Sequence, residues 1–153
     1  MFLSDPSPIA REVIGRYPGL QVIDPTVSEL RAAIQQVTGE AHCQAIFDTV
    51  GTAETMQQAL ELLAPVGTYV DLAVHDTSLP LNARVLGSER TLTSSSNAYY
   101  RDEREAHALI RSGAVDVRSM ITHRFRLDQY QEAFDLLLQE PKQAYKVVFV
   151  SES

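Results

Sequence analysis

The sequence predicts an α/β protein with a doubly wound parallel sheet. Short apolar runs with strand character alternate with segments whose apolar residues recur at helical spacing, and the alternation continues along the 153 residues. The composition agrees, because 44% hydrophobic and 22% charged residues are ordinary for a globular protein with its own core. Strands that alternate with helices normally pair in parallel, so we expect a sheet with helices on its faces.

The first half of the chain predicts three strand–helix units. The strands are short apolar runs that end at an acid, a proline or a glycine, and they cover residues 2–4, 21–24 and 44–50. Ser7, followed by proline, predicts the N-cap of the first helix. Thr26 with Glu29 has the form of a capping box for the second helix. The third helix is expected over residues 52–64.

The second half continues the alternation and ends in a strand–helix–strand tail. The strands expected here cover residues 68–74, 90–96, 121–127 and 145–150. A helix is expected at 102–111, with Ala106, Leu109 and Ile110 facing inward. Asp128, which has Gln three residues later, predicts the cap of the last helix.

Charge and cysteine content exclude several classes of function. The net charge is −7 and the 13 basic residues are scattered, which argues against a nucleic-acid or anionic-membrane partner. Cys43 is the single cysteine, so a disulfide framework and a multi-cysteine zinc site are excluded. His42 is adjacent to it, a spacing that seldom lets both side chains reach one ion, and no metal site is expected. A lone cysteine suits a reducing compartment, so we expect a cytoplasmic protein.

Candidate binding residues follow the predicted strands, because ligands of doubly wound sheets bind at the carboxyl ends of the strands. These residues are Asp5, Asp24, Thr49, Val50, Gly51, Leu72, Ala73, Val74, Ser95, Ser96 and Asn97. An acid after the second strand of a dinucleotide-binding fold accepts hydrogen bonds from the ribose hydroxyls and repels a 2′-phosphate. Asp5 follows the strand at 2–4, and it fits that position if this strand is the second one of such a fold. An acid before Pro6 can also merely start a turn.

One long run of sequence resembles a known family. "VIDPT…LRAAIQQVTG…AIFDTVGTAETMQQALELLAPVGTYVDLAV", followed by "ITHRF", "LDQYQEAFDLL" and "KVVFV", is similar to the coenzyme domain of medium-chain, zinc-type alcohol dehydrogenases, including sorbitol- and threonine-dehydrogenase-like members. The resemblance covers essentially the whole chain. It implies a partial, NAD-binding, Rossmann-like domain at residues 1–118. Residues 119–153 would be a tail that in the family packs on the catalytic domain.

The resemblance also implies what is missing. In the family, a strand and a Gly-rich turn that holds the pyrophosphate precede the segment matching residues 2–5, and a catalytic domain with the zinc ligands comes before them. This sequence has no Gly-x-Gly-x-x-Gly fingerprint. We therefore expect the C-terminal portion of a dehydrogenase that lacks the first strand of its sheet. The strands at 2–4 and 44–50 would then either pair directly or leave a gap.

Residue by residue, the resemblance implies a cofactor site. Asp5 matches the ribose-binding acid and favours NAD over NADP. Residues 49–51 match the strand end beside the adenine and nicotinamide riboses, and residues 72–74 match backbone along the nicotinamide carboxamide. Residues 95–97 match the last strand end, although Ser replaces the frequent Gly at the first position. Lys146 matches a basic residue that reaches the pyrophosphate, but it is equally consistent with a solvated lysine on an edge strand.

Three functions remain open from the sequence. The first is the NAD-binding portion of an oxidoreductase that transfers hydride between an alcohol and NAD. Its NAD binding would be weak or vestigial and it would not be catalytic alone, because the zinc ligands of the family are absent from this chain. The second is a non-catalytic remnant that acts through subunit association, as a homodimer through the strand at 90–96 or with a missing catalytic half. The third is another doubly wound nucleotide binder, such as a methyltransferase.

Overall fold

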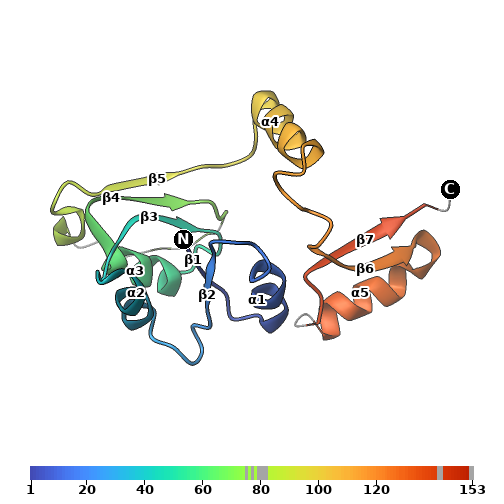
Figure 1. The fold of residues 1–153 in the computed structure, drawn as a ribbon, viewed down its shortest axis with the longest axis horizontal. Helices are drawn as coiled ribbons and strands as arrows, with labels where there is room; N and C mark the ends of the chain where they lie inside the picture. The colour runs from blue at the N-terminus through green and yellow to red at the C-terminus, as the bar shows by residue number, and fades with distance from the viewer. Residues whose placement is uncertain (75, 77, 79–82, 141–142, 152–153) are drawn as a thin grey trace. The chain divides into compact units, whose positions relative to one another are not determined.

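Residues 1–74, 76, 78, 83–140 and 143–151 are described by a computed structural model, in which strands and helices alternate along the chain (Figure 1). The chain divides into two units, one formed by Met1–Leu30 with Tyr100–Ser153 and the other by Arg31–Tyr99. The family-derived boundary at residue 118 is a different division and stays a prediction. Among the described residues, no helix combines the length and the apolar character needed to cross a membrane.

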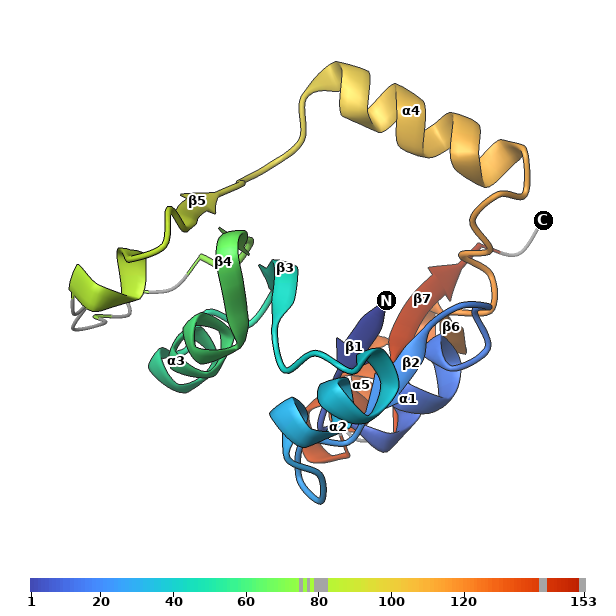
Figure 2. The same cartoon turned by 60° about the vertical axis from the view of Figure 1, so that its left-hand side comes forward.

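The unit formed by Arg31–Tyr99 contains a three-stranded parallel sheet. Its strands lie in the order β3 (Cys43–Asp48), β4 (Leu63–Asp71) and β5 (Thr91–Ser94). Helix α3 (Ala53–Leu62) connects β3 to β4 and lies against both strands (Figure 2). A short 3₁₀ turn, η1 (Ala83–Leu86), precedes β5. Parallel pairing requires such crossover connections, which explains the strand–helix alternation of the sequence.

The core of this sheet explains where α3 ends. Helix α3 begins directly after Thr52, which forms a reciprocal capping box with Thr55. It ends at Leu62 rather than residue 64, because Leu63 is fully buried and pairs with Cys43 as the first residue of β4. Strand β4 therefore starts five residues earlier than the predicted residue 68.

The β1–β2 pair opens the other unit. Strands β1 (Phe2–Ser4) and β2 (Gln21–Ile23) are parallel, and α1 (Pro8–Ile14) joins them. Ser7 caps α1 as predicted, since its hydroxyl accepts a hydrogen bond from the backbone N–H of Ala10. The predicted capping box at Thr26 is wrong. Helix α2 (Leu30–Thr38) begins four residues later, and Thr26 instead donates both its N–H and its hydroxyl to the carboxylate of Asp24.

The C-terminal strand–helix–strand tail is confirmed. Strands β6 (Ile121–Arg126) and β7 (Lys146–Val150) are parallel and are connected through η2 (Leu127–Gln129) and α5 (Tyr130–Gln139). The cap predicted at Asp128 is wrong, because its carboxylate pairs with the guanidinium of Arg126 and α5 starts at Tyr130. On α5, Ala133 is buried.

Helix α4 (Tyr100–Arg111) departs from the sequence expectation. None of its side chains is buried, and Leu109 and Ile110 remain 48% and 43% exposed. The inward orientation predicted for Ala106, Leu109 and Ile110 is therefore wrong in this structure. The amphipathic spacing predicted the helix correctly, but it could not specify whether another element covers its apolar stripe.

All the strand pairs of the described residues are parallel, which confirms the predicted α/β class. They form three separate sheets, β1–β2, β3–β4–β5 and β6–β7. Strands β1 and β3 belong to different units, and whether they pair directly or leave a gap stays a prediction.

Candidate functional site

The three strands β3, β4 and β5 end level with one another. Asp48 is the register partner of Asp71, and Asp71 is the partner of Ser94. The ladder continues into the following turns, because Leu72 N–H donates to the Asp48 carbonyl and Ser95 N–H donates to the Asp71 carbonyl. The sheet thereby brings nine of the predicted residues to one edge: Thr49, Val50, Gly51, Leu72, Ala73, Val74, Ser95, Ser96 and Asn97.

Asp48, which sequence reasoning missed, organises the first turn of this edge. Among the described residues, Asp48 is the charged residue that is buried, with an exposed fraction of 7%. Its Oδ1 accepts from the backbone N–H groups of Val50 at 2.8 Å and Gly51 at 3.0 Å. Its Oδ2 accepts from the hydroxyls of Thr55 at 2.9 Å and Tyr69 at 3.1 Å. One carboxylate therefore joins the turn, the first turn of α3 and the carboxyl-terminal part of β4.

The charge state of Asp48 follows from these contacts. Burial raises the pKa of a carboxyl group, but the hydrogen bonds from Gly51, Val50, Thr55 and Tyr69 outweigh it and hold the pKa of Asp48 below its ordinary value. Burial and the adjacent Asp48 charge raise the pKa of Tyr69. At neutral pH, Asp48 is thus an anion and Tyr69 a neutral donor. The sequence signal for this site is an acid near the end of the strand expected at residues 44–50, three residues before Gly51.

The other two turns of the edge are more open. After β4, the Asp71 carboxylate accepts from the N–H of Ala73 at 3.0 Å. Leu72 and Val74 are 39% and 85% exposed, and Val50 is 48% exposed. After β5, Asn97 adopts a left-handed backbone conformation with φ 62°. The edge therefore presents backbone polar groups beside exposed aliphatic side chains, a combination suited to the planar rings and ribose hydroxyls of a nucleotide.

Asp5 lies in the other unit, directly after β1. Its Oδ1 accepts from the N–H of Ser7 at 2.7 Å, so the carboxylate does start a turn. Its carbonyl oxygen accepts from Arg11 Nη1 at 2.8 Å, and the second terminal nitrogen of Arg11 forms an ion pair with Asp24 at 2.6 Å. The ribose-binding role of Asp5 stays a prediction.

Lys146 begins β7 and is exposed. Opposite Lys146, the register of β6 shifts between Ile121 and His123, as in a β-bulge. The hydroxyl of Thr122 lies at this shift, where it accepts from the N–H groups of Tyr145 and Lys146 and donates to the Lys146 carbonyl. These contacts fix the backbone of Lys146 and involve no atom of its ammonium group. Its predicted pyrophosphate contact stays a prediction.

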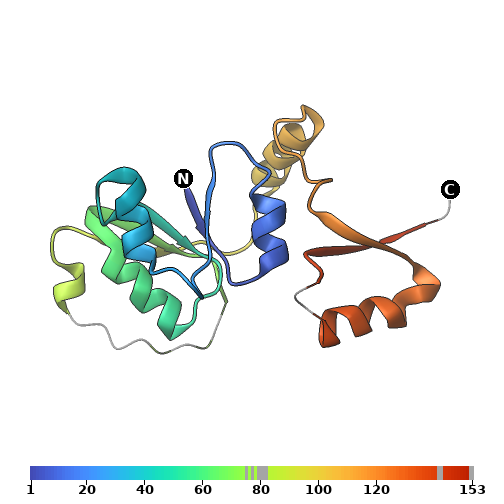
Figure 3. The same ribbon diagram turned by 60° about the horizontal axis from the view of Figure 1, so that its bottom comes forward.

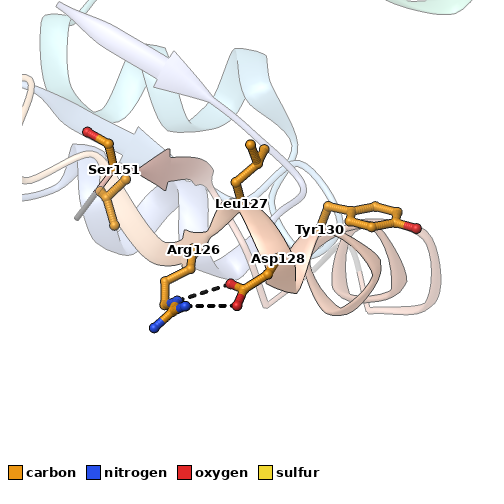
Figure 4. Close-up of a pocket in the computed structure, with 6 residues that line it drawn as sticks. Arg126, Leu127, Asp128, Tyr130 and Ser151 are labelled. Atoms are coloured by element: carbon orange, nitrogen blue, oxygen red, sulfur yellow. Dashed lines mark hydrogen bonds and ion pairs between the residues drawn. The ribbon is translucent and has the colours of Figure 1, made fainter.

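An open hollow of about 620 Å³ lies at the end of the β6–β7 pair (Figure 4). Its lining residues are Arg126, Leu127, Asp128, Tyr130, Val150 and Ser151. The guanidinium of Arg126 donates to both carboxylate oxygens of Asp128, at 3.0 and 2.9 Å, on an exposed surface. None of the predicted site residues lines the hollow, and its charged groups already satisfy each other.

The side chains of the described residues do not fit a zinc ion. Within the described ranges, no three His, Cys, Asp or Glu side chains lie close enough together to hold a metal ion. Burial raises the pKa of the Cys43 thiol, which disfavours the thiolate form that binds metals.

A sequence model described as zinc-binding dehydrogenase matches residues 19–148. The chain belongs to the zinc-binding dehydrogenase family. Over 118 residues, this dehydrogenase-family chain is 30% identical to an alcohol dehydrogenase of Cupriavidus necator, an alignment that covers 74% of the chain and 32% of the relative. It is 28% identical over 109 residues to sorbitol dehydrogenase 1 of Saccharomyces cerevisiae, covering 70% and 30%. The predicted family is confirmed, and the chain spans about a third of the length of these curated relatives.

Solved dehydrogenase structures share the fold. An Escherichia coli oxidoreductase/dehydrogenase of unknown specificity superposes with a TM-score of 0.88 at 22% identity, covering 99% of this chain and 44% of that one. A second structure, described as a short chain alcohol dehydrogenase from Escherichia coli complexed with NADH, gives a TM-score of 0.84 at 16% identity, covering 98% and 44%. These likenesses confirm the Rossmann-like α/β fold predicted from the sequence.

Proposed function

We propose that this chain is the nicotinamide-dinucleotide-binding part of an alcohol dehydrogenase-like oxidoreductase, whose reaction is hydride transfer between an alcohol and NAD. The family match over residues 19–148 carries the proposal. The nine residues at the level carboxyl ends of β3, β4 and β5 support it, because this is the edge where doubly wound sheets bind nucleotides.

Each part of the site has a separate task in this proposal. The bound dinucleotide supplies the carbon that accepts or releases the hydride. The turns at residues 49–51, 72–74 and 95–97 hold and orient its ribose and nicotinamide portions. Asp5 accepts hydrogen bonds from the adenosine ribose and repels a 2′-phosphate, and Lys146 pairs with the pyrophosphate. Asp48 touches none of these groups; it acts by keeping the first turn in shape.

We further propose that the chain by itself binds NAD weakly and does not turn over an alcohol. Alcohol oxidation requires a Lewis acid or a proton acceptor beside the carbinol, and a wall that orients it. The described side chains do not fit a zinc site. The sequence has no Gly-rich fingerprint, so few backbone amides are available for the pyrophosphate.

Subunit association is the second candidate function. It is favoured by β5, the outer strand of its sheet. Within the described part of the chain, β5 pairs with β4 along one side, and its other side, the lateral edge of the sheet, has no strand partner. A homodimer, or a complex with a separate catalytic half, would use that edge. The methyltransferase alternative receives no support, since the family match is to dehydrogenases.

Calorimetric titration of the full chain with NAD and NADP tests the proposed function. We expect weak binding of NAD, weaker binding of NADP, and loss of that preference in Asp5→Ala. Glu12→Gln, which neutralises an exposed acid on α1, is the matched control and should keep the preference. Absence of NAD binding, or a wild-type preference for NADP, would refute the proposal. Formation of NADH from alcohols, followed by absorbance, would refute the expectation that the lone chain is inactive.

A further inference from the structure

Three charged residues lie near the carboxyl end of the β1–β2 pair. Asp5 follows β1 and Asp24 follows β2, and Arg11 belongs to α1. Helix α1 packs against β2 (Figure 3). Arg11 Nη1 donates to the Asp5 carbonyl at 2.8 Å, and its Nη2 pairs with Asp24 Oδ2 at 2.6 Å. The ion-pair side chains are only 20% and 24% exposed, so this guanidinium is held beside the end of β1.

Asp24 is well suited to hold the guanidinium. Its Oδ1 accepts from the N–H of Thr26 at 2.9 Å and from its hydroxyl at 2.6 Å, which leaves Oδ2 directed at Arg11. The Thr26 hydrogen bonds, followed by the charge of Arg11, lower the pKa of Asp24 despite the opposing effect of burial. The carboxylate is thus a fixed anion, and the Arg11 charge is neutralised where it stands.

An arginine in this place has a chemical consequence for cofactor choice. NADP differs from NAD by a 2′-phosphate on the adenosine ribose, and dinucleotide folds that accept NADP place an arginine near the end of the second strand to bind that phosphate. A guanidinium binds phosphate strongly because it presents two parallel donors. Arg11 is at such a position, but each of its terminal nitrogens already has a partner: Nη1 donates to the Asp5 carbonyl and Nη2 pairs with Asp24.

We infer that Asp24 is a specificity-determining residue, which excludes NADP by engaging the Arg11 guanidinium that would otherwise bind the 2′-phosphate. The inference rests on the proposed nucleotide binding and deepens it. Two acids then set the preference. Asp5 repels the 2′-phosphate directly, and Asp24 removes the cation that would compensate for that repulsion. When Asp24 loses its charge, the Asp5 carbonyl still keeps Arg11 at the strand end.

The test compares NAD and NADP affinities of the full chain by calorimetric titration. Asp24→Asn should raise the affinity for NADP relative to NAD by about tenfold, the gain typical of one charge-assisted phosphate contact. The double variant Asp24→Asn/Arg11→Gln should lose that gain. Thr26→Val is the matched control, because it removes a hydrogen bond from Asp24 without releasing Arg11, and it should discriminate like the wild type. Asp24→Ser repeats the test if Asp24→Asn fails to fold.

The outcomes separate this inference from the proposed function. If NAD binds and Asp24→Asn keeps the wild-type preference, the inference is wrong while the proposed function stands. If the double variant retains the NADP gain, removal of negative charge alone explains the effect and the inference is likewise wrong. If neither nucleotide binds any variant, the proposed function fails and this inference fails with it. Titrations with 5′-AMP and adenosine 2′,5′-bisphosphate repeat the comparison on the ribose portion alone.

Discussion

At the scale of single residues, Asp48 shows how a buried charge shapes the proposed binding edge. An uncompensated carboxylate in a protein interior is costly, but this one accepts four hydrogen bonds from the turn, α3 and β4. Gly51 adopts φ 67°, a conformation that suits glycine, and its N–H points at the carboxylate. The turn that would receive the dinucleotide is therefore held in place before any ligand arrives.

Replacing Asp48 by Ala should lower the free energy of unfolding by about 2–4 kcal/mol, because Tyr69 and the buried N–H of Gly51 lose their acceptor. Denaturant unfolding measures this loss. Asp128→Asn, which breaks an exposed ion pair, should cost less than about 1 kcal/mol and serves as the control. Equal losses in the two variants would contradict the role given to Asp48.

The pH dependence of stability gives a second readout of Asp48. Its pKa is lowered by folding, so its stabilising contribution is complete above the unfolded pKa and is lost as the pH falls through the folded value. Between about pH 5 and about pH 2, Asp48→Asn should therefore lose less stability than the wild type does. If the stability of both proteins fell equally as the pH is lowered, another carboxyl group would dominate the pH dependence.

The sequence predicted the strand end at residues 49–51 but not the residue that holds it. The strand end follows from a local pattern, an apolar run closed by glycine. The role of Asp48 depends on Tyr69, which is 21 positions away in the chain and reaches the carboxylate only once β3 and β4 pair. Such a partner is specified by strand register, and register is not visible in a local sequence pattern.

At the scale of elements, local patterns predicted which segments form helices and strands, but not always where those elements begin and end. The cap at Ser7 was predicted because its partner, Ala10, lies within one turn of the same helix. The start of β4 was not predicted, because Leu63 leaves the helix to pair with Cys43 and to fill the core. The cap at Thr26 failed for a local reason, since its hydroxyl donates to Asp24, two residues earlier in the same turn.

Leu63 and Leu109 form a matched pair for testing the element assignments. Leu63→Ala should destabilise the chain by about 2–5 kcal/mol, because it leaves a cavity in the core beneath α3. Leu109→Ala, on the half-exposed stripe of α4, should cost less than about 1 kcal/mol. Denaturant midpoints of the two variants provide the comparison. Equal losses would mean that the α4 stripe is covered in solution, as the sequence alone suggested.

At the scale of the whole molecule, open sheet edges set the association behaviour. The described strands form sheets of two, three and two members, so every sheet has outer strands whose second edge carries no strand partner within the described residues. Unpaired backbone donors and acceptors along an edge recruit other chains. The net charge of −7 opposes this tendency by mutual repulsion, but salt screens that repulsion over about 10 Å at 0.1 M ionic strength.

We therefore expect the chain to self-associate, and to do so more strongly as salt is added. Strand β5 offers a specific edge for this. The N–H of Ser95 donates to β4, and because backbone groups alternate along a strand, the N–H of Ser94 points to the open edge. Ser94→Pro removes that donor without removing a bond to β4, so it should shift light-scattering mass towards the monomer at equal concentration. Ser96→Ala, beyond the strand, is the control.

If Ser94→Pro associates like the wild type, β5 is not the contact, and the open edges of β1 and β3 become the next to block. If the wild type stays monomeric across concentration and salt, self-association through open edges is refuted, and the homodimer form of the second candidate function loses its physical basis.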